Sequence, residues 1–274
     1  MVKDDWIYMG VGLNLKMIRQ FLSILLLLLT LTSCSQDYSV RKQVESNPNF
    51  PDGEYTFPIL EGPDKSVTNK INSYLVDDQL NIVLGQEEES IFEYVWQKPD
   101  DPFARINYLT FNVNLLNRKL YTVTISGEFC GAYCEGYDMS YTFDLTSGDL
   151  LTLDTLFNRN GQEKLLSELK EYKRKLIEKK INELKQITQS DTLESGDQEY
   201  YQNMLDLYQN CNSEYTDLKY FRYIPSQDSL EIIYGRCSAH YNRNVDELWY
   251  FNKSISIDEW SEQLSEIGKE KIKN

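Results

Sequence analysis

The sequence has few of the residues that most often carry catalysis or hold a metal. Its 274 residues include a single histidine, His240. Zinc sites in proteins usually need cysteine pairs with two-residue spacing or several histidines, and neither pattern occurs. The sequence also has no Gly-x-Ser-x-Gly motif and no glycine-rich phosphate-binding loop. These absences argue against the common hydrolase and nucleotide-binding classes, and no metal or other cofactor is expected.

Positive charge is also scarce. The chain has 28 lysines and arginines against 43 aspartates and glutamates, so its net charge is −15. Such a surface repels nucleic acid, which is therefore not an expected partner, and attracts basic proteins. Solubility alone also explains the charge and is the favoured interpretation.

The only long apolar run, residues 21–31, has eleven residues, whereas a membrane-spanning helix needs about 20. Lys16 and Arg19 precede it, and small residues follow it. A charged start, a short apolar core and a small-residue exit are typical of an export signal. Residues 1–33 are therefore predicted to be a signal peptide. Met17 is expected to be its true start, because such signals begin at their own methionine.

The end of this segment, Leu31-Thr32-Ser33-Cys34, resembles the lipobox of bacterial lipoproteins. The resemblance implies that Cys34 is lipidated and becomes the mature N-terminus. The protein would then be attached to a bacterial membrane through its lipid, facing the periplasm or the cell surface. Residues 35–53 are polar and contain two prolines and a glycine, so residues 34–53 are predicted to form a lipidated cysteine and a flexible tether.

Four cysteines remain: Cys130, Cys134, Cys211 and Cys237. Spare thiols outside the cytoplasm tend to oxidise, and an even number fits two disulfides with three possible connectivities. The pairing Cys130–Cys134 with Cys211–Cys237 is favoured, because the first pair brackets a glycine-containing loop. A redox centre and a metal clip are weaker alternatives, since the first spacing is one residue longer than Cys-x-x-Cys.

Alternating apolar and polar residues predict β-structure through much of the chain. The strongest signal is a hairpin of residues 105–115 and 120–129. A strand at 54–60 is expected to end at an edge proline, Pro58, and residues 91–97 are an ambiguous strand. Further strands are expected at 139–145, 150–153, 218–224, 229–235 and 247–252.

Helical periodicity predicts a long amphipathic helix at 161–187. Shorter helices are expected at 66–84, stopped by Gly85, at 198–208, capped by Asp197, and after a capping box at 256–259. Antiparallel strands with interspersed helices indicate an α+β fold, in which the long helix and the shorter ones pack on antiparallel sheets. Residues 54–274 are expected to form one such domain, which can also be divided into two subdomains near 150–160.

The segment YTFDLTSGDLLTLDTLF, residues 141–157, resembles the signature of an extracytoplasmic domain of unknown function. That domain occurs in the outer part of the anti-sigma factor RsiV and the N-terminal part of the peptidoglycan deacetylase PdaC. The resemblance covers most of residues 54–267 and is specific in the middle. It implies a cell-wall-related partner, such as a lysozyme-like protein. The family often carries a Gly-Gly-Ala-His-Gly loop before the signature, but here Tyr133 replaces the histidine, so no role of that histidine carries over.

These observations favour a lipid-anchored, non-catalytic domain that binds a ligand or a protein. A glycan- or peptidoglycan-binding module is an alternative, with Tyr133, Tyr137 and Trp249 as candidate ligand-contacting residues beside Tyr141. Tyrosines at strand spacing are equally typical of half-buried structure. An envelope hydrolase is a further alternative, although His240 has no partner pattern and is expected to be a loop residue.

Overall fold

The fold is described from a computed structural model. It describes residues 37–47, 50–96, 105–131, 134–189, 193–211, 216–239, 245–248 and 250–273. The predicted signal peptide, Cys34, Tyr133, His240 and Trp249 lie outside these residues. Tyr38–Asn274 forms one compact unit. Among the described residues, the helices are too short or too polar to cross a membrane.

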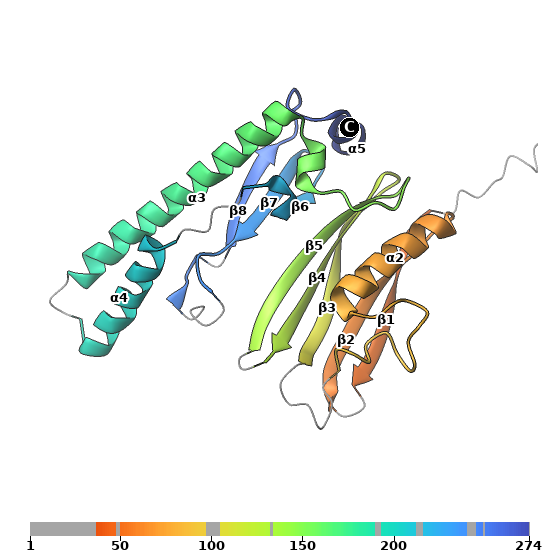
Figure 1. Ribbon diagram of the computed structural model, residues 1–274, viewed down its shortest axis with the longest axis horizontal. Helices are drawn as coiled ribbons and strands as arrows, with labels where there is room; N and C mark the ends of the chain where they lie inside the picture. The colour runs from red at the N-terminus through yellow and green to blue at the C-terminus, as the bar shows by residue number, and fades with distance from the viewer. Residues whose placement is uncertain are drawn as a thin grey trace, which may run out of the picture. The chain divides into compact units, whose positions relative to one another are not determined.

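A five-stranded sheet forms the first half of this unit (Figure 1). Its order is β1-β2-β3-β4-β5, and every neighbouring pair is antiparallel except β2 and β3, which are parallel. The predicted hairpin is confirmed as β3 and β4. The strands are β1 (Ser39–Asn47), β2 (Phe50–Glu61), β3 (Arg105–Leu116), β4 (Leu120–Cys130) and β5 (Cys134–Asp144).

Strand β1 corrects the prediction of a flexible tether. It pairs with β2 along its length, from Ser39 opposite Glu61 to Asn47 opposite Phe50. An edge strand is held by backbone hydrogen bonds on one side and can be polar, which hides it from a search for apolar alternation. Pro58 is also not the end of an edge strand, because β2 continues to Glu61 and lies between β1 and β3.

Helix α2 (Lys65–Leu80) lies over one face of this sheet (Figure 1). The side chain of Asp64 caps it by accepting hydrogen bonds from the backbone N–H groups of Ser66 and Val67. The helix ends at Asn81, which adopts a left-handed conformation with φ of 54°, and not at the predicted Gly85. Asparagine tolerates this conformation better than most residues, so it ends the helix as glycine often does.

The second half contains the long helix α3 and a three-stranded antiparallel sheet of order β6-β7-β8. Figure 1 shows α3 running along this sheet. The prediction of a long helix is confirmed. The elements are η1 (Leu153–Leu156), α3 (Arg159–Thr188), α4 (Ser195–Gln209), η2 (Leu218–Tyr220), β6 (Arg222–Pro225), β7 (Ser229–Gly235), β8 (Tyr250–Ser256) and α5 (Glu266–Ile272).

Several predicted elements differ in kind. Residues 150–153 form no strand: Leu150 makes one isolated bridge, and the 3-10 helix η1 follows. Residues 91–96 form turns. At the predicted capping box, Ser256 Oγ accepts a hydrogen bond from the Glu259 N–H at 3.4 Å, yet turns follow. The last helix begins at Glu266. The N-cap position of α4 is Glu194, which makes no side-chain capping hydrogen bond, and the predicted cap Asp197 lies in the first turn.

Two main apolar cores result, and together with the mixed and antiparallel sheets they confirm the α+β class. The first lies between α2 and the five-stranded sheet, and the second between α3 and the three-stranded sheet. A small third core joins α3 to α4. Representative fully buried residues are Phe57, Ile71, Leu75 and Tyr121 in the first core, Leu165, Leu169, Ile232 and Phe251 in the second, and Leu184 and Met204 in the third.

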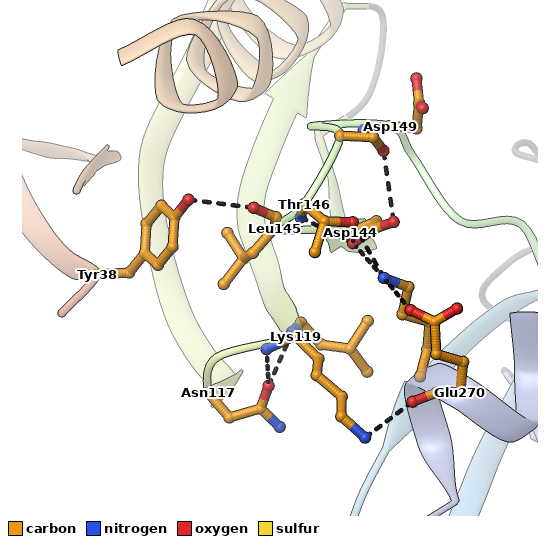
Figure 2. A network of polar contacts seen from close by, with 11 residues as sticks. Tyr38, Asn117, Lys119, Asp144, Leu145, Thr146, Asp149 and Glu270 are labelled. Atoms are coloured by element: carbon orange, nitrogen blue, oxygen red, sulfur yellow. Dashed lines mark hydrogen bonds and ion pairs between the residues drawn. The ribbon is translucent and has the colours of Figure 1, made fainter. Parts of the chain in front are cut away.

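A polar network around Asp144, at the end of β5, connects it to α5 (Figure 2). Lys271 Nζ lies 2.8 Å from Asp144 Oδ1, and the side chains are 5% and 12% exposed. Burial alone would raise the pKa of Asp144, but hydrogen bonds from Lys271 and Thr146 lower it below its ordinary value. Lys119 Nζ also donates to the Glu270 carbonyl at 2.8 Å. The network therefore fastens the C-terminal helix to the five-stranded sheet.

Candidate ligand-binding pocket

A pocket of about 340 Å³ opens on the five-stranded half, near the C-terminal end of α2. This volume lies in the range of small-ligand sites, about 300–1,000 Å³. Its walls come from α2, the turns at 91–96, and the ends of β3, β4 and β5. The lining residues are Asp78, Gln79, Tyr94, Val95, Ile106, Phe129 and Tyr137.

The β4–β5 hairpin supplies two of the aromatic rings. Gly127 pairs with Tyr137, and a Cβ at Gly127 would lie 2.8 Å from the Tyr137 hydroxyl oxygen. Only a residue without a side chain lets this tyrosine lie so close to the sheet. The disulfide between Cys130 and Cys134 closes the hairpin immediately beyond Phe129. The local sequence therefore fixes the backbone that carries both rings.

Tyr94 comes from the turns between α2 and β3. Its neighbour Phe92 is fully buried, with its ring centroid 5.9 Å from that of Tyr55. The carboxylate of Glu93 accepts hydrogen bonds from the backbone N–H groups of residues 88–90. These contacts hold the turns, while Tyr94 stays 58% exposed and Phe129 48% exposed. Two large rings therefore face solvent from fixed backbone.

Asp78 provides the charge of the pocket. Its Oδ2 accepts hydrogen bonds from the Tyr141 hydroxyl at 2.5 Å and from Gln79 Nε2 at 2.9 Å. Gln79 Nε2 also donates to the Tyr141 hydroxyl at 2.5 Å, which closes a triangle. In the part of the chain that the structure describes, Asp78 Oδ1 has no hydrogen bond and no lysine or arginine pairs with Asp78. The carboxylate is oriented by neutral donors only.

Tyr137, which lines the pocket, and Tyr141, which contacts Asp78, keep their hydroxyl protons at neutral pH. Burial raises the pKa of Tyr137 to about 12, and the nearby Tyr108 and Asp78 contribute to this rise. Burial and the hydrogen bond to Asp78 raise the pKa of Tyr141 as well. Both hydroxyls therefore act as hydrogen-bonding groups and not as phenolate nucleophiles. A carboxylate, an amide and three aromatic rings suit binding better than covalent chemistry.

Other candidate groups are engaged in the fold. Glu128, Cys130 and Cys134 place possible metal-ligand atoms within 4.8 Å of one another, but the two sulfurs are bonded to each other and are not thiolates. The second disulfide joins Cys211 to Cys237. The favoured pairing of the four cysteines is thus confirmed. Two disulfides fit an extracytoplasmic domain.

A second groove, of about 330 Å³, lies between α3 and β8. Its charges already compensate one another, since Lys253 Nζ lies 3.0 Å from the Glu168 carboxylate and Glu171 pairs with Arg174 and Lys175. This groove therefore presents fewer unpaired charged groups to a ligand than the pocket at Asp78 does.

The structure brings only part of the predicted ligand patch into this pocket. Tyr137 lines it and Tyr141 orients its carboxylate, whereas Tyr133 and Trp249 lie outside the described residues. Sequence reasoning missed Asp78, Gln79, Tyr94 and Phe129. These residues come from three separate segments, and the sequence contains no signal that groups them.

Searches of protein families and of curated proteins find no match to this chain. Solved structures do match. One is a member of the DUF3298 family from Bacteroides fragilis, with 15% identity, a TM-score of 0.49, and coverage of 85% of this chain and 96% of that one. Another is a DUF3298 family protein from Pseudomonas aeruginosa PAO1, with 13% identity, a TM-score of 0.46, and coverage of 85% and 95%. Both of these structural neighbours are thus DUF3298 family proteins.

Proposed function

We propose that this protein is a lipid-anchored domain of the bacterial cell envelope that binds a glycan without transforming it, and that the pocket at Asp78 is its binding site. One observation carries the proposal: the exposed rings of Tyr94 and Phe129 flank an oriented carboxylate in a pocket of ligand size. Exposed apolar side chains that gather in a groove beside polar groups are typical of a binding site.

A glycan matches this set of groups. The apolar faces of sugar rings can stack on Tyr94 and Phe129, while a sugar hydroxyl donates a hydrogen bond to Oδ1 of Asp78, an exposed residue. A purely apolar ligand would bring no donor for Oδ1 of Asp78, the carboxylate oxygen that Tyr141 and Gln79 do not use. The pocket therefore favours the glycan-binding alternative, with a cell-wall glycan as the ligand class.

Location in the envelope has two supports. The disulfides fit an oxidising compartment, and the lipobox-like segment ending at Cys34 carries the proposal of a lipid anchor. Metabolic labelling with a fatty acid checks the anchor: the wild-type protein should incorporate label and the Cys34→Ser variant should not. Label retained by the variant would remove the anchor from the proposal.

A basic, lysozyme-like protein remains the second candidate partner, because the net charge of −15 attracts basic surfaces. Such attraction between exposed charges weakens with salt, whose screening length is about 8 Å at 0.15 M. Binding that persists at this salt concentration would therefore favour a specific protein partner.

The test is a calorimetric titration of the mature chain from Ser35, with disulfides intact, against soluble cell-wall glycan fragments and against a lysozyme. Glycan binding should weaken about fivefold in Tyr94→Ala, the loss of one stacking contact of about 1 kcal/mol. Tyr220→Ala is the matched control, because Tyr220 is 63% exposed but lines neither pocket described above. No glycan binding, or equal affinity in both variants, would refute the assignment.

A further inference from the structure

We infer that the pocket at Asp78 selects glycans that carry a positively charged amine, so that an amino sugar with a free amine binds better than its N-acetylated form. This inference rests on the proposed glycan-binding function and adds the chemical class of the ligand.

The first argument is the geometry of the carboxylate. An ionised carboxylate has two oxygens and accepts hydrogen bonds but donates none. Tyr141 and Gln79 both use Oδ2 of Asp78, and they fix the orientation of the group. The other oxygen, Oδ1, has no hydrogen bond partner in the described part of the chain. One face of an oriented carboxylate is therefore available to a donor.

The second argument is the excess of acceptors. Gln79 must direct its amide nitrogen at Asp78, because a carboxylate oxygen can only accept. Its carbonyl oxygen, Oε1, is consequently left buried and without a partner among the described residues. The site therefore has more acceptors than donors, and its accessible acceptor is Oδ1 of Asp78, an exposed residue. A ligand that brings donors and no acceptor matches such a site. An ammonium group has three donors and no acceptor, whereas an N-acetyl group brings one of each.

The third argument is the charge and the rings. Among the residues that the structure describes, the pocket lining includes one carboxylate, no lysine and no arginine, and the whole chain is acidic. The negative charge of Asp78 acts inside the pocket, since it contributes, after burial and Tyr108, to the raised pKa of the lining residue Tyr137. The faces of Tyr94, Phe129 and Tyr137 also attract a cation. Carboxylate and aromatic rings thus favour the same charge on the ligand.

The test compares chitosan tetramer, which carries free amines, with chitin tetramer, in which the amines are acetylated. Both are titrated into the mature chain at 0.15 M salt and at a pH where the amines are protonated. Wild-type protein should bind the chitosan tetramer about tenfold more tightly, the difference between a charge-assisted and a neutral hydrogen bond. Asp78→Asn, which keeps the shape and removes the charge, should abolish the preference.

Asp77→Asn is the matched control, because Asp77 is the neighbouring exposed residue on α2 and does not line the pocket. Equal binding of the two tetramers to wild type would overturn this inference and leave glycan binding intact. A preference lost equally in both variants, or retained in both, would assign it to the acidic surface as a whole and overturn the inference as well. Binding of neither tetramer would overturn both proposals.

Discussion

The two halves of the molecule place their aromatic residues differently. Both have a helix over a sheet and one disulfide. In the five-stranded half, Tyr94 and Phe129 are about half exposed beside a carboxylate that has no cationic partner among the described residues. In the three-stranded half, Phe251 and Trp260 are 1% and 5% exposed, and the most exposed ring, Tyr220, lies 4.9 Å from Lys219 Nζ. The first half therefore combines exposed rings with an oriented carboxylate, whereas the second half buries these two rings and places a lysine beside Tyr220.

The largest effect should come from comparing a phenylalanine in each half. Phe251→Ala removes a fully buried ring from the second core and should cost about 4 kcal/mol of unfolding free energy. Phe129→Ala removes a half-exposed ring and should cost about 1 kcal/mol or less, while weakening ligand binding. Denaturant unfolding and ligand titration measure the two effects. Similar unfolding costs would contradict the proposed division of roles.

Removing the disulfide of the second half should also cost more stability than removing the disulfide of the first half. Replacing Cys211 and Cys237, 26 residues apart, by alanine should cost about 3.5 kcal/mol, because a long loop in the unfolded chain loses much entropy when it is closed. The same change at Cys130 and Cys134, four residues apart, should cost about 2 kcal/mol. Urea unfolding of the two double variants gives the order. A reversed order would mean that the hairpin near the pocket contributes more to stability than its loop length implies.

The next largest change in unfolding free energy is expected from breaking the ion pair between α5 and the five-stranded sheet. Lys271→Met leaves the buried Asp144 carboxylate unpaired and should destabilise the protein by about 3 kcal/mol at pH 7. Lys269→Met is the control on the same helix, where the pair with Glu266 is exposed, and it should change stability little. Unfolding curves of the two variants measure the difference.

The same pair fixes a pH dependence. The lowered pKa of Asp144 contributes stability that is present above the unfolded value, near 3.8, and is lost as the pH falls through the lowered one. Burial lowers the pKa of Lys271, but hydrogen bonds to Asp144 and Glu270 raise it more, so the net pKa lies above its ordinary value. The stability that Lys271 contributes is therefore lost at alkaline pH. In Lys271→Met, acid should reduce stability less steeply. Unchanged acid sensitivity would show that the pair does not control it.

The smallest effect on stability is expected from Lys173, a residue of the second half that is only 7% exposed. Burial lowers the pKa of Lys173 to about 8, although Asp246 opposes this shift. Between pH 8 and 10 the unfolded chain binds this proton and the folded chain releases it, so stability should rise with pH by about 2 kcal/mol in wild type. Lys173→Met should lack this rise. Parallel curves for the two proteins would exclude the lowered pKa.

Much of the fold could be predicted because long segments repeat one pattern. The β3–β4 hairpin alternates clearly, and α3 carries an apolar stripe over thirty residues. Short segments were less predictable. Residues 150–153 alternate like a strand, but only Leu150 bridges to Phe143 before the chain turns into η1. Strand β1 was missed because its pairing is a property of the backbone and of a partner strand.

The candidate site was less predictable than the fold. Tyr137 could be proposed from the sequence because amphipathic tyrosine rings suit wet, concave sites. Asp78 is one of 43 acidic residues and stands on a solvated helix face, so its sequence neighbours do not distinguish it. Its role follows from the sheet beneath it, which brings Tyr141 to its carboxylate from 63 residues away.

The position of strand β1 also limits how far the pocket could move from a membrane anchor at Cys34. It begins at Ser39, five residues after Cys34, so a lipid anchor at Cys34 would be joined to the folded unit by a segment of roughly 17 Å at most. With so short a connection, the domain would diffuse in the plane of the membrane and would stay close to the membrane surface. Its ligand would have to come within the combined reach of this connection and of the folded unit itself, and confinement near the bilayer raises the encounter frequency of even a weak binding site.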